Sequence, residues 1–97
     1  MSAPDTTEKL MSISRAEFLA SLVHVGSALE TADGVWTVPL DGGGNAIITF
    51  EAVPGVRLGG LLDLPRARVS IRFDGGSTAA CRKFLLRFEL AFQRGGG

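Results

Sequence analysis

Residues 66–73 alternate strictly between polar and apolar side chains, and this pattern limits the possible fold more than any other feature. Arginine and serine occupy the even positions, whereas alanine, valine, isoleucine and phenylalanine occupy the odd ones. A period of two places all the apolar side chains on one face, so the segment predicts a half-buried β-strand. We therefore expect a sheet with one covered face, and the covering elements should carry apolar stripes of helical spacing.

The first such stripe predicts a helix over residues 15–30. Ser14 and Glu17 fit a capping box, in which the serine hydroxyl accepts a backbone hydrogen bond and the glutamate reaches back to the cap. The apolar positions recur at intervals of three and four, as one buried helix face requires. They are Phe18, Leu22, Val25 and Leu29.

The second stripe predicts a helix near the end of the chain. It follows the Asp74–Gly76 turn, takes Ser77 or Thr78 as its N-cap, and ends at Gly95. Its apolar positions again recur at intervals of three and four. They are Cys81, Phe84, Leu85, Phe88 and Phe92.

The middle of the chain is expected to form strands. Residues 35–40 and 46–53 are rich in strand-forming side chains and flank a glycine-rich turn, which predicts a hairpin. Residues 56–64 are ambiguous, because their apolar side chains suit burial while Gly59 and Gly60 weaken a strand. They are interpreted either as a bulged or edge strand or as a packed loop.

The expected order is α-β-β-(β)-β-α, with the ambiguous segment in brackets. It predicts a small single-domain α+β sandwich, in which both helices cover one face of a mainly antiparallel sheet of three to four strands. Residues 13–94 should form this domain, residues 1–12 a flexible arm and residues 95–97 a flexible glycine tail. The strand residues expected in its core are Trp36, Val38, Leu40, Ile48, Phe50, Val69, Ile71 and Phe73.

Charge is divided unevenly along the chain, although the formal net charge is zero. Residues 1–51 carry seven acids and two bases, whereas residues 52–97 carry three acids and eight bases. The basic half is where a partner or the chain's own acidic half is expected to dock. The sequence shows neither a signal peptide nor the roughly 20 apolar residues of a membrane span, so we expect a cytoplasmic protein without membrane contact.

Few residues are suited to catalysis or metal binding. His24 is the only histidine, Cys81 is the only cysteine, and the chain has no tyrosine. Cys81 belongs to the core stripe of one helix and His24 to the polar face of the other, so we do not expect them to form a pair. The acids also lack the spacing of a calcium loop. The sequence therefore predicts no enzyme, no metal and no cofactor.

The turn from strand to helix at residues 74–78 is a candidate anion site. Backbone amides at such a turn can hold an anion, and two basic side chains follow one helical turn later. The alternative interpretation, which we prefer, is a tight turn followed by a helix cap. The residues that would hold the anion are Gly75, Gly76, Ser77, Arg82 and Lys83.

Arg66, Arg68 and Arg72 form a basic face on the alternating strand, with a spacing that can follow phosphates. Proteins that bind single strands on an open sheet also need aromatic side chains for stacking. The predicted face offers threonine and Glu51 instead, so we prefer cross-strand pairing with acids of the first half. Nucleic-acid binding ranks third among the candidate functions.

Two leucines of the second helix depart from its amphipathic pattern. Leu86 and Leu90 lie opposite the core stripe, on the side that also carries Arg82 and Arg87. An apolar pair with a polar rim is typical of an association surface. Two alternatives remain. Single exposed leucines are common on protein surfaces, and residues 56–64 could instead fold over these two.

The sequence thus favours a small non-catalytic accessory or adaptor domain. It would act by associating with itself, as a homodimer, or with a larger protein. The alternative function is binding of a small ligand or anion, either at residues 55–64 or at the 74–78 turn.

Overall fold

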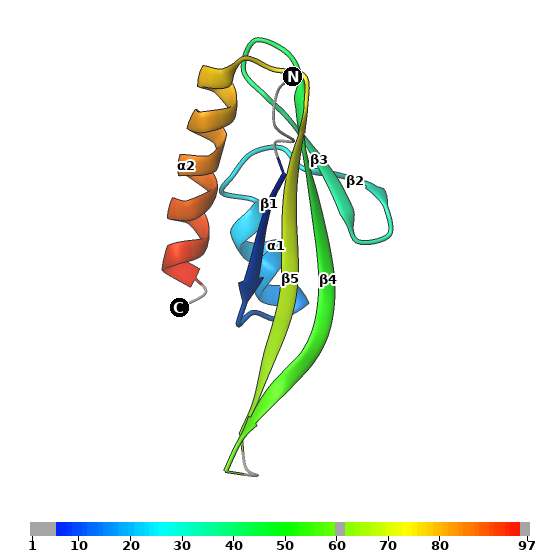
Figure 1. Ribbon diagram of the computed structural model, residues 1–97, viewed down its shortest axis with the longest axis vertical. Helices are drawn as coiled ribbons and strands as arrows, with labels where there is room; N and C mark the ends of the chain where they lie inside the picture. Colours follow the sequence, from blue (N-terminus) through cyan, green and yellow to red (C-terminus); the bar gives the residue numbers. More distant parts are fainter. Residues whose placement is uncertain (1–5, 60–61, 96–97) are drawn as a thin grey trace.

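The computed structural model describes residues 6–59 and 62–95. In this part of the chain, two helices and a five-stranded sheet follow one another in the order β-α-β-β-β-β-α (Figure 1). The α+β class is therefore confirmed. The elements are β1 (Thr6–Met11), α1 (Arg15–Leu22), β2 (Leu29–Ala32), β3 (Val35–Pro39), β4 (Asn45–Leu58), β5 (Leu62–Asp74) and α2 (Thr78–Gly95).

The sheet is antiparallel throughout, with the strand order β1-β5-β4-β3-β2. It has five strands instead of the expected three to four: β1 precedes the first helix and β2 follows it, while the bracketed segment joins β4 and β5 instead of forming a strand of its own. Residues 6–11, assigned from the sequence to a flexible arm, pair with β5 from Thr6 opposite Arg72 to Met11 opposite Ala67. Residues 1–5, 96 and 97, which belong to the predicted arm and tail, lie outside the described residues.

The first helix begins as predicted. The Glu17 amide donates to the Ser14 hydroxyl at 3.2 Å, and the Ser14 amide donates to Glu17 Oε1 at 2.9 Å. These reciprocal bonds complete the capping box and fix the start of α1 at Arg15.

The same helix ends earlier than the predicted residue 30. The C-cap of α1 is Val23, and Leu29 already belongs to β2. Valine and glycine are poor helix formers, and both occur between these two positions. Gly26 also passes close to the sheet, since a Cβ atom there would lie 3.0 Å from Val38 Cγ1. The chain therefore leaves the helix early and enters the edge strand β2.

One hydrophobic core lies between the two helices and one face of the sheet (Figure 1). The Phe18 ring of α1 lies 4.8 Å from the ring of Phe50 and 5.5 Å from that of Phe92 on α2. The predicted stripe of α2 faces this core. All eight strand residues expected in the core are buried or packed against it: Trp36, Val38, Leu40, Ile48, Phe50, Val69, Ile71 and Phe73.

β4 and β5 continue beyond the other strands as a two-stranded extension (Figure 1), formed by residues 53–59 and 62–66. From here on, "the arm" means this extension and not the N-terminal segment. Its strands pair Val56 with Leu64 and Arg57 with Asp63, after a register shift between Val53 and Val56. Of the ambiguous segment, residues 56–58 end one strand and residues 62–64 begin the next, with a bulge at the base, while residues 60 and 61 lie outside the described residues.

Candidate interaction surface

The side of α2 that faces away from the core carries Leu86 and Leu90. Their exposed fractions are 61% and 62%, whereas Phe88 between them is 1% exposed. Helical residues four apart lie one turn apart on the same face, so the two leucines form one small apolar patch. The described residues of the candidate cover, 56–58 and 62–64, pair with each other along the arm instead.

Two basic neighbours of this patch are engaged within the chain. Lys83 Nζ lies 3.6 Å from Asp41 Oδ2, in the turn after β3. Arg87 Nη1 donates to the Val25 carbonyl oxygen at 3.4 Å, in the loop after α1. Both side chains therefore contact the same chain beside the leucines.

The opposite flank of α2 carries a further ion pair, between Glu89 Oε2 and Lys9 Nζ of β1 at 3.6 Å. Arg82, the other predicted rim residue, is exposed. The charge of Lys83 is thus partly offset by Asp41, whereas the bond from Arg87 to a backbone carbonyl leaves the charge of Arg87 in place.

The predicted anion site is only partly assembled. A pocket of about 370 Å³ borders the turn between β5 and α2, and Gly75, Gly76 and Arg82 line it. Ser77 and Lys83 are not among its lining residues. The structure therefore gathers three of the five candidate residues around one pocket.

The turn residues also have structural roles that account for their presence. The Ser77 hydroxyl accepts the Ala80 amide at 3.0 Å, and its carbonyl accepts the Cys81 amide at 3.0 Å. Ser77 is thus the helix cap: its hydroxyl engages one of the four amides that a helix start leaves free, and its carbonyl accepts the first hydrogen bond within the helix. Gly75 and Gly76 have φ values of 80° and 88°, which favour glycine.

On the basic strand face, Arg68 pairs with acids on both neighbouring strands. Arg68 Nη1 lies 3.2 Å from Glu51 Oε1 on β4, and Arg68 Nε lies 3.9 Å from Glu8 Oε1 on β1. Cross-strand pairing with an acid of the first half is thus confirmed for Arg68, whose direct partner on β4 is Glu51. The residues opposite Arg66, Arg68 and Arg72 on the adjacent strands are Thr6, Leu10, Ile47, Glu51 and Val53, all of them non-aromatic.

His24 is exposed beyond the end of α1, and Cys81 is half-buried with its Sγ atom 3.9 Å from the Gly75 carbonyl oxygen. Within the described residues, no group of three or more His, Cys, Asp or Glu side chains is placed to hold a metal ion. Among those same residues, no helix combines the length and the apolarity needed to cross a membrane.

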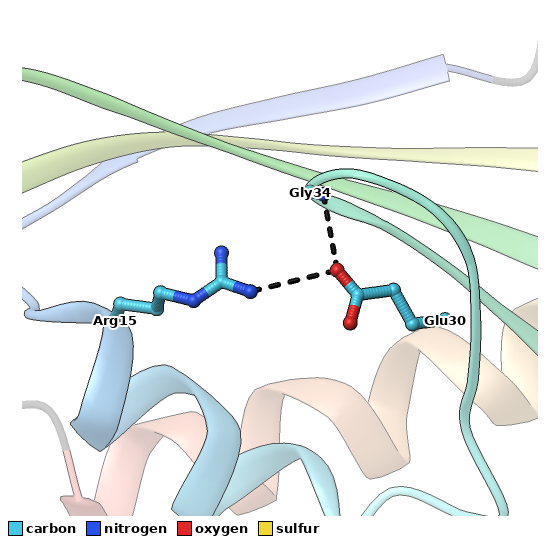
Figure 2. A network of polar contacts seen from close by, with 3 residues as sticks. All are labelled: Arg15, Glu30 and Gly34. Carbon is cyan, nitrogen blue, oxygen red and sulfur yellow. Dashed lines mark hydrogen bonds and ion pairs between the residues drawn. The ribbon is translucent and has the colours of Figure 1, made fainter.

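A polar network at the start of α1 was missed from the sequence (Figure 2). Glu30 Oε2 accepts the Gly34 amide at 3.3 Å and lies 3.5 Å from Arg15 Nη2. The Arg15 guanidinium carbon also lies 5.2 Å from the centre of the Trp36 ring. The network was missed because Glu30 was assigned to a helix. The Asp-Gly pair at residues 33–34, a strong hairpin signal, could have revealed it.

No known protein family, curated protein or solved structure matches this chain. What the protein does has to be inferred from its own surfaces.

Proposed function

We propose that this protein is a small non-catalytic association domain and that the outer face of α2 docks against a second copy of the chain. The observation that carries the proposal is the exposure of Leu86 and Leu90, one helical turn apart and opposite the buried stripe. Complete burial of a leucine is worth about 1.5–3 kcal/mol, so covering the pair favours association.

The contacts of the neighbouring charges favour a second copy as the occupant. A two-fold contact brings the same patch of both molecules together, so free cations on it would face like charges. The ion pair of Lys83 with Asp41 lowers this repulsion, and the Arg87 side chain is engaged by the Val25 carbonyl oxygen beside the leucines. A two-fold axis near the patch would gather four leucines in one apolar seam.

This seam is small, so the dimer should be weak and reversible. Stable protein interfaces usually bury about 1,200–2,000 Å² in total, which is more than four leucine side chains supply. We therefore expect monomers and dimers to exchange at tens to hundreds of micromolar protein.

Sedimentation velocity over this concentration range tests the proposal. The wild type should shift toward dimer as the concentration rises, while Leu86→Glu with Leu90→Glu should remain a folded monomer. Leu29→Glu is the matched control, because Leu29 is similarly exposed but lies on the edge strand β2. A monomeric wild type throughout would contradict self-association, and unfolding of the double variant would assign the leucines to the core.

Anion binding at the 74–78 turn is the weaker candidate. The pocket beside Gly75, Gly76 and Arg82 supports it. The bond from the Ala80 amide to the Ser77 hydroxyl argues against it, because it leaves one free amide fewer for an anion. Titration with inorganic phosphate separates the two functions, because anion binding would shift the amide resonances of Gly75 and Gly76 and would weaken in Arg82→Gln.

A further inference from the structure

A hollow of about 410 Å³ lies at the base of the arm, between the start of α1, the turn from β2 to β3, and strands β4 and β5. Phe50, Ala52 and Pro65 give it an apolar lining. Phe50 is half-buried, with its ring 4.8 Å from that of Phe18, so the hydrophobic core is continuous with this lining.

The edge of β4 beside this hollow has unpaired backbone groups. β3 pairs with β4 only as far as Val35 opposite Thr49, and the Phe50 amide then donates to the Gly34 carbonyl oxygen at 2.9 Å. Backbone groups alternate in direction along a strand, so those of Ala52 point to the same edge as those of Phe50. In the described part of the chain, no strand pairs with Ala52 on this edge.

Charged side chains also line the hollow. Arg15 and Arg66 line it together with a single acid, Asp33. Glu30 offsets part of the Arg15 charge, but one bond to Glu30 leaves other guanidinium donors available. With Glu30 counted, two acids balance the two arginines, so the hollow offers a carboxylate hydrogen-bond donors of Arg15 and Arg66 rather than a net positive charge.

We propose that this hollow binds an extended peptide segment of a partner protein, which adds to β4 as a short strand and carries a carboxylate. The peptide backbone would pair with Ala52, one apolar side chain would cover Phe50 and Pro65, and the carboxylate would lie near the arginines. In strand addition of this kind, backbone hydrogen bonds supply the affinity, and the contacts of every second side chain supply the specificity. Pro54, which has no amide hydrogen, limits the added strand to a few residues.

Amide NMR spectra of the ¹⁵N-labelled protein, recorded with three synthetic peptides, test this proposal. The first is an acetylated pentapeptide of alternating valine and threonine that ends in aspartate. The second ends in lysine amide instead, and the third is the aspartate peptide with alternate backbone amides methylated. The aspartate peptide should shift the amides of Gly34 and Ala52, the lysine peptide should bind at least about threefold more weakly, and the methylated peptide should not bind.

Substitutions on the protein supply the second part of the test. Arg15→Gln with Arg66→Gln should weaken the aspartate peptide at least about fivefold. Arg57→Gln should not, because Arg57 lies farther along the arm and pairs with Asp63. If loss of the Arg15 network unfolds the double variant, Arg66→Gln alone replaces it, and it should also weaken binding of the aspartate peptide. Trp36 fluorescence reports binding independently, because Arg15 lies over its ring.

Three results would overturn the proposal: unshifted Gly34 and Ala52 amides at millimolar peptide, equal binding of the methylated peptide, or equal binding of the lysine peptide. The variant Leu86→Glu with Leu90→Glu should bind the aspartate peptide as the wild type does. A failure of this proposal is therefore distinguishable from a failure of self-association.

Discussion

Gly44 and Gly76 lie backbone against backbone, where the turn between β3 and β4 meets the turn between β5 and α2. A Cβ atom added at Gly44 would overlap the Gly76 nitrogen. Both residues have positive φ values, 84° and 88°. This contact fixes two distant turns against each other and, with them, the first residues of α2.

Replacing Gly76 should therefore destabilise the fold more than replacing a glycine in open space. A Cβ atom at Gly76 would lie 2.6 Å from Leu40 Cδ1, in addition to the cost of its φ value. We expect Gly76→Ala to lower the free energy of unfolding by about 1–3 kcal/mol in urea denaturation.

Gly42→Ala is the control for that prediction. Gly42 has a φ of 82°, and a Cβ atom there meets nothing within 4 Å, so this change should cost only the backbone strain of about 1–2 kcal/mol. Equal losses at Gly42 and Gly76 would show that the close approach of Gly76 to Leu40 adds nothing to the backbone strain.

Phe88→Ala should lower the free energy of unfolding by about 3–5 kcal/mol, because Phe88 is buried in the core. The matched change Leu86→Ala, two residues earlier on the exposed face of the same helix, should stay within about 0.5 kcal/mol. Chemical denaturation at low protein concentration measures both. Similar losses for the two variants would contradict the assigned orientation of α2.

Glu51 and Arg68 should couple weakly in a double-mutant cycle, by about 0.2–1 kcal/mol, because both side chains are exposed. The coupling should decrease as salt is added, since salt screens exposed charges. Glu51 with Arg72 is the control cycle, because the cross-strand partners of Arg72 are Thr6 and Ile47. A coupling at Arg72 as large as that at Arg68 would refute the specific pair.

Glu30→Gln should be better tolerated than Glu30→Ala. Glutamine retains an oxygen that can accept the Gly34 amide, whereas alanine removes both the hydrogen bond and the ion pair with Arg15. The difference should be about 1 kcal/mol in the free energy of unfolding. Both changes should alter Trp36 emission by moving Arg15, and unchanged emission would contradict the stacked arrangement.

The sequence predicted those parts of the fold in which the alternation of polar and apolar residues shows which face is buried. Residues 66–73 and the stripe of α2 have clear periods, so their faces were identified without knowledge of their neighbours. β1 has no such signal, because its half-buried positions are Thr7, Lys9 and Met11. Its strand conformation comes from pairing with the edge of β5, which is a tertiary effect.

The candidate surface was predictable to a similar extent. Helical angles alone placed Leu86 and Leu90 opposite the core. The acceptors of Lys83 and Arg87, by contrast, lie in a turn and a loop whose positions depend on the whole fold. The hollow beside β4 depends on where β3 stops pairing, and no local pattern encodes that position.

The pairing of β1 with β5 has a consequence for synthesis on the ribosome. Translation produces β1 before the other elements, but within the described chain its backbone partner is β5, which only α2 follows. The nascent chain therefore carries residues 6–11 without their backbone partner through most of its production. The same segment can meet the β5 edge of another unfinished chain on a crowded polysome, and prompt completion of β5 is the step that favours correct closure.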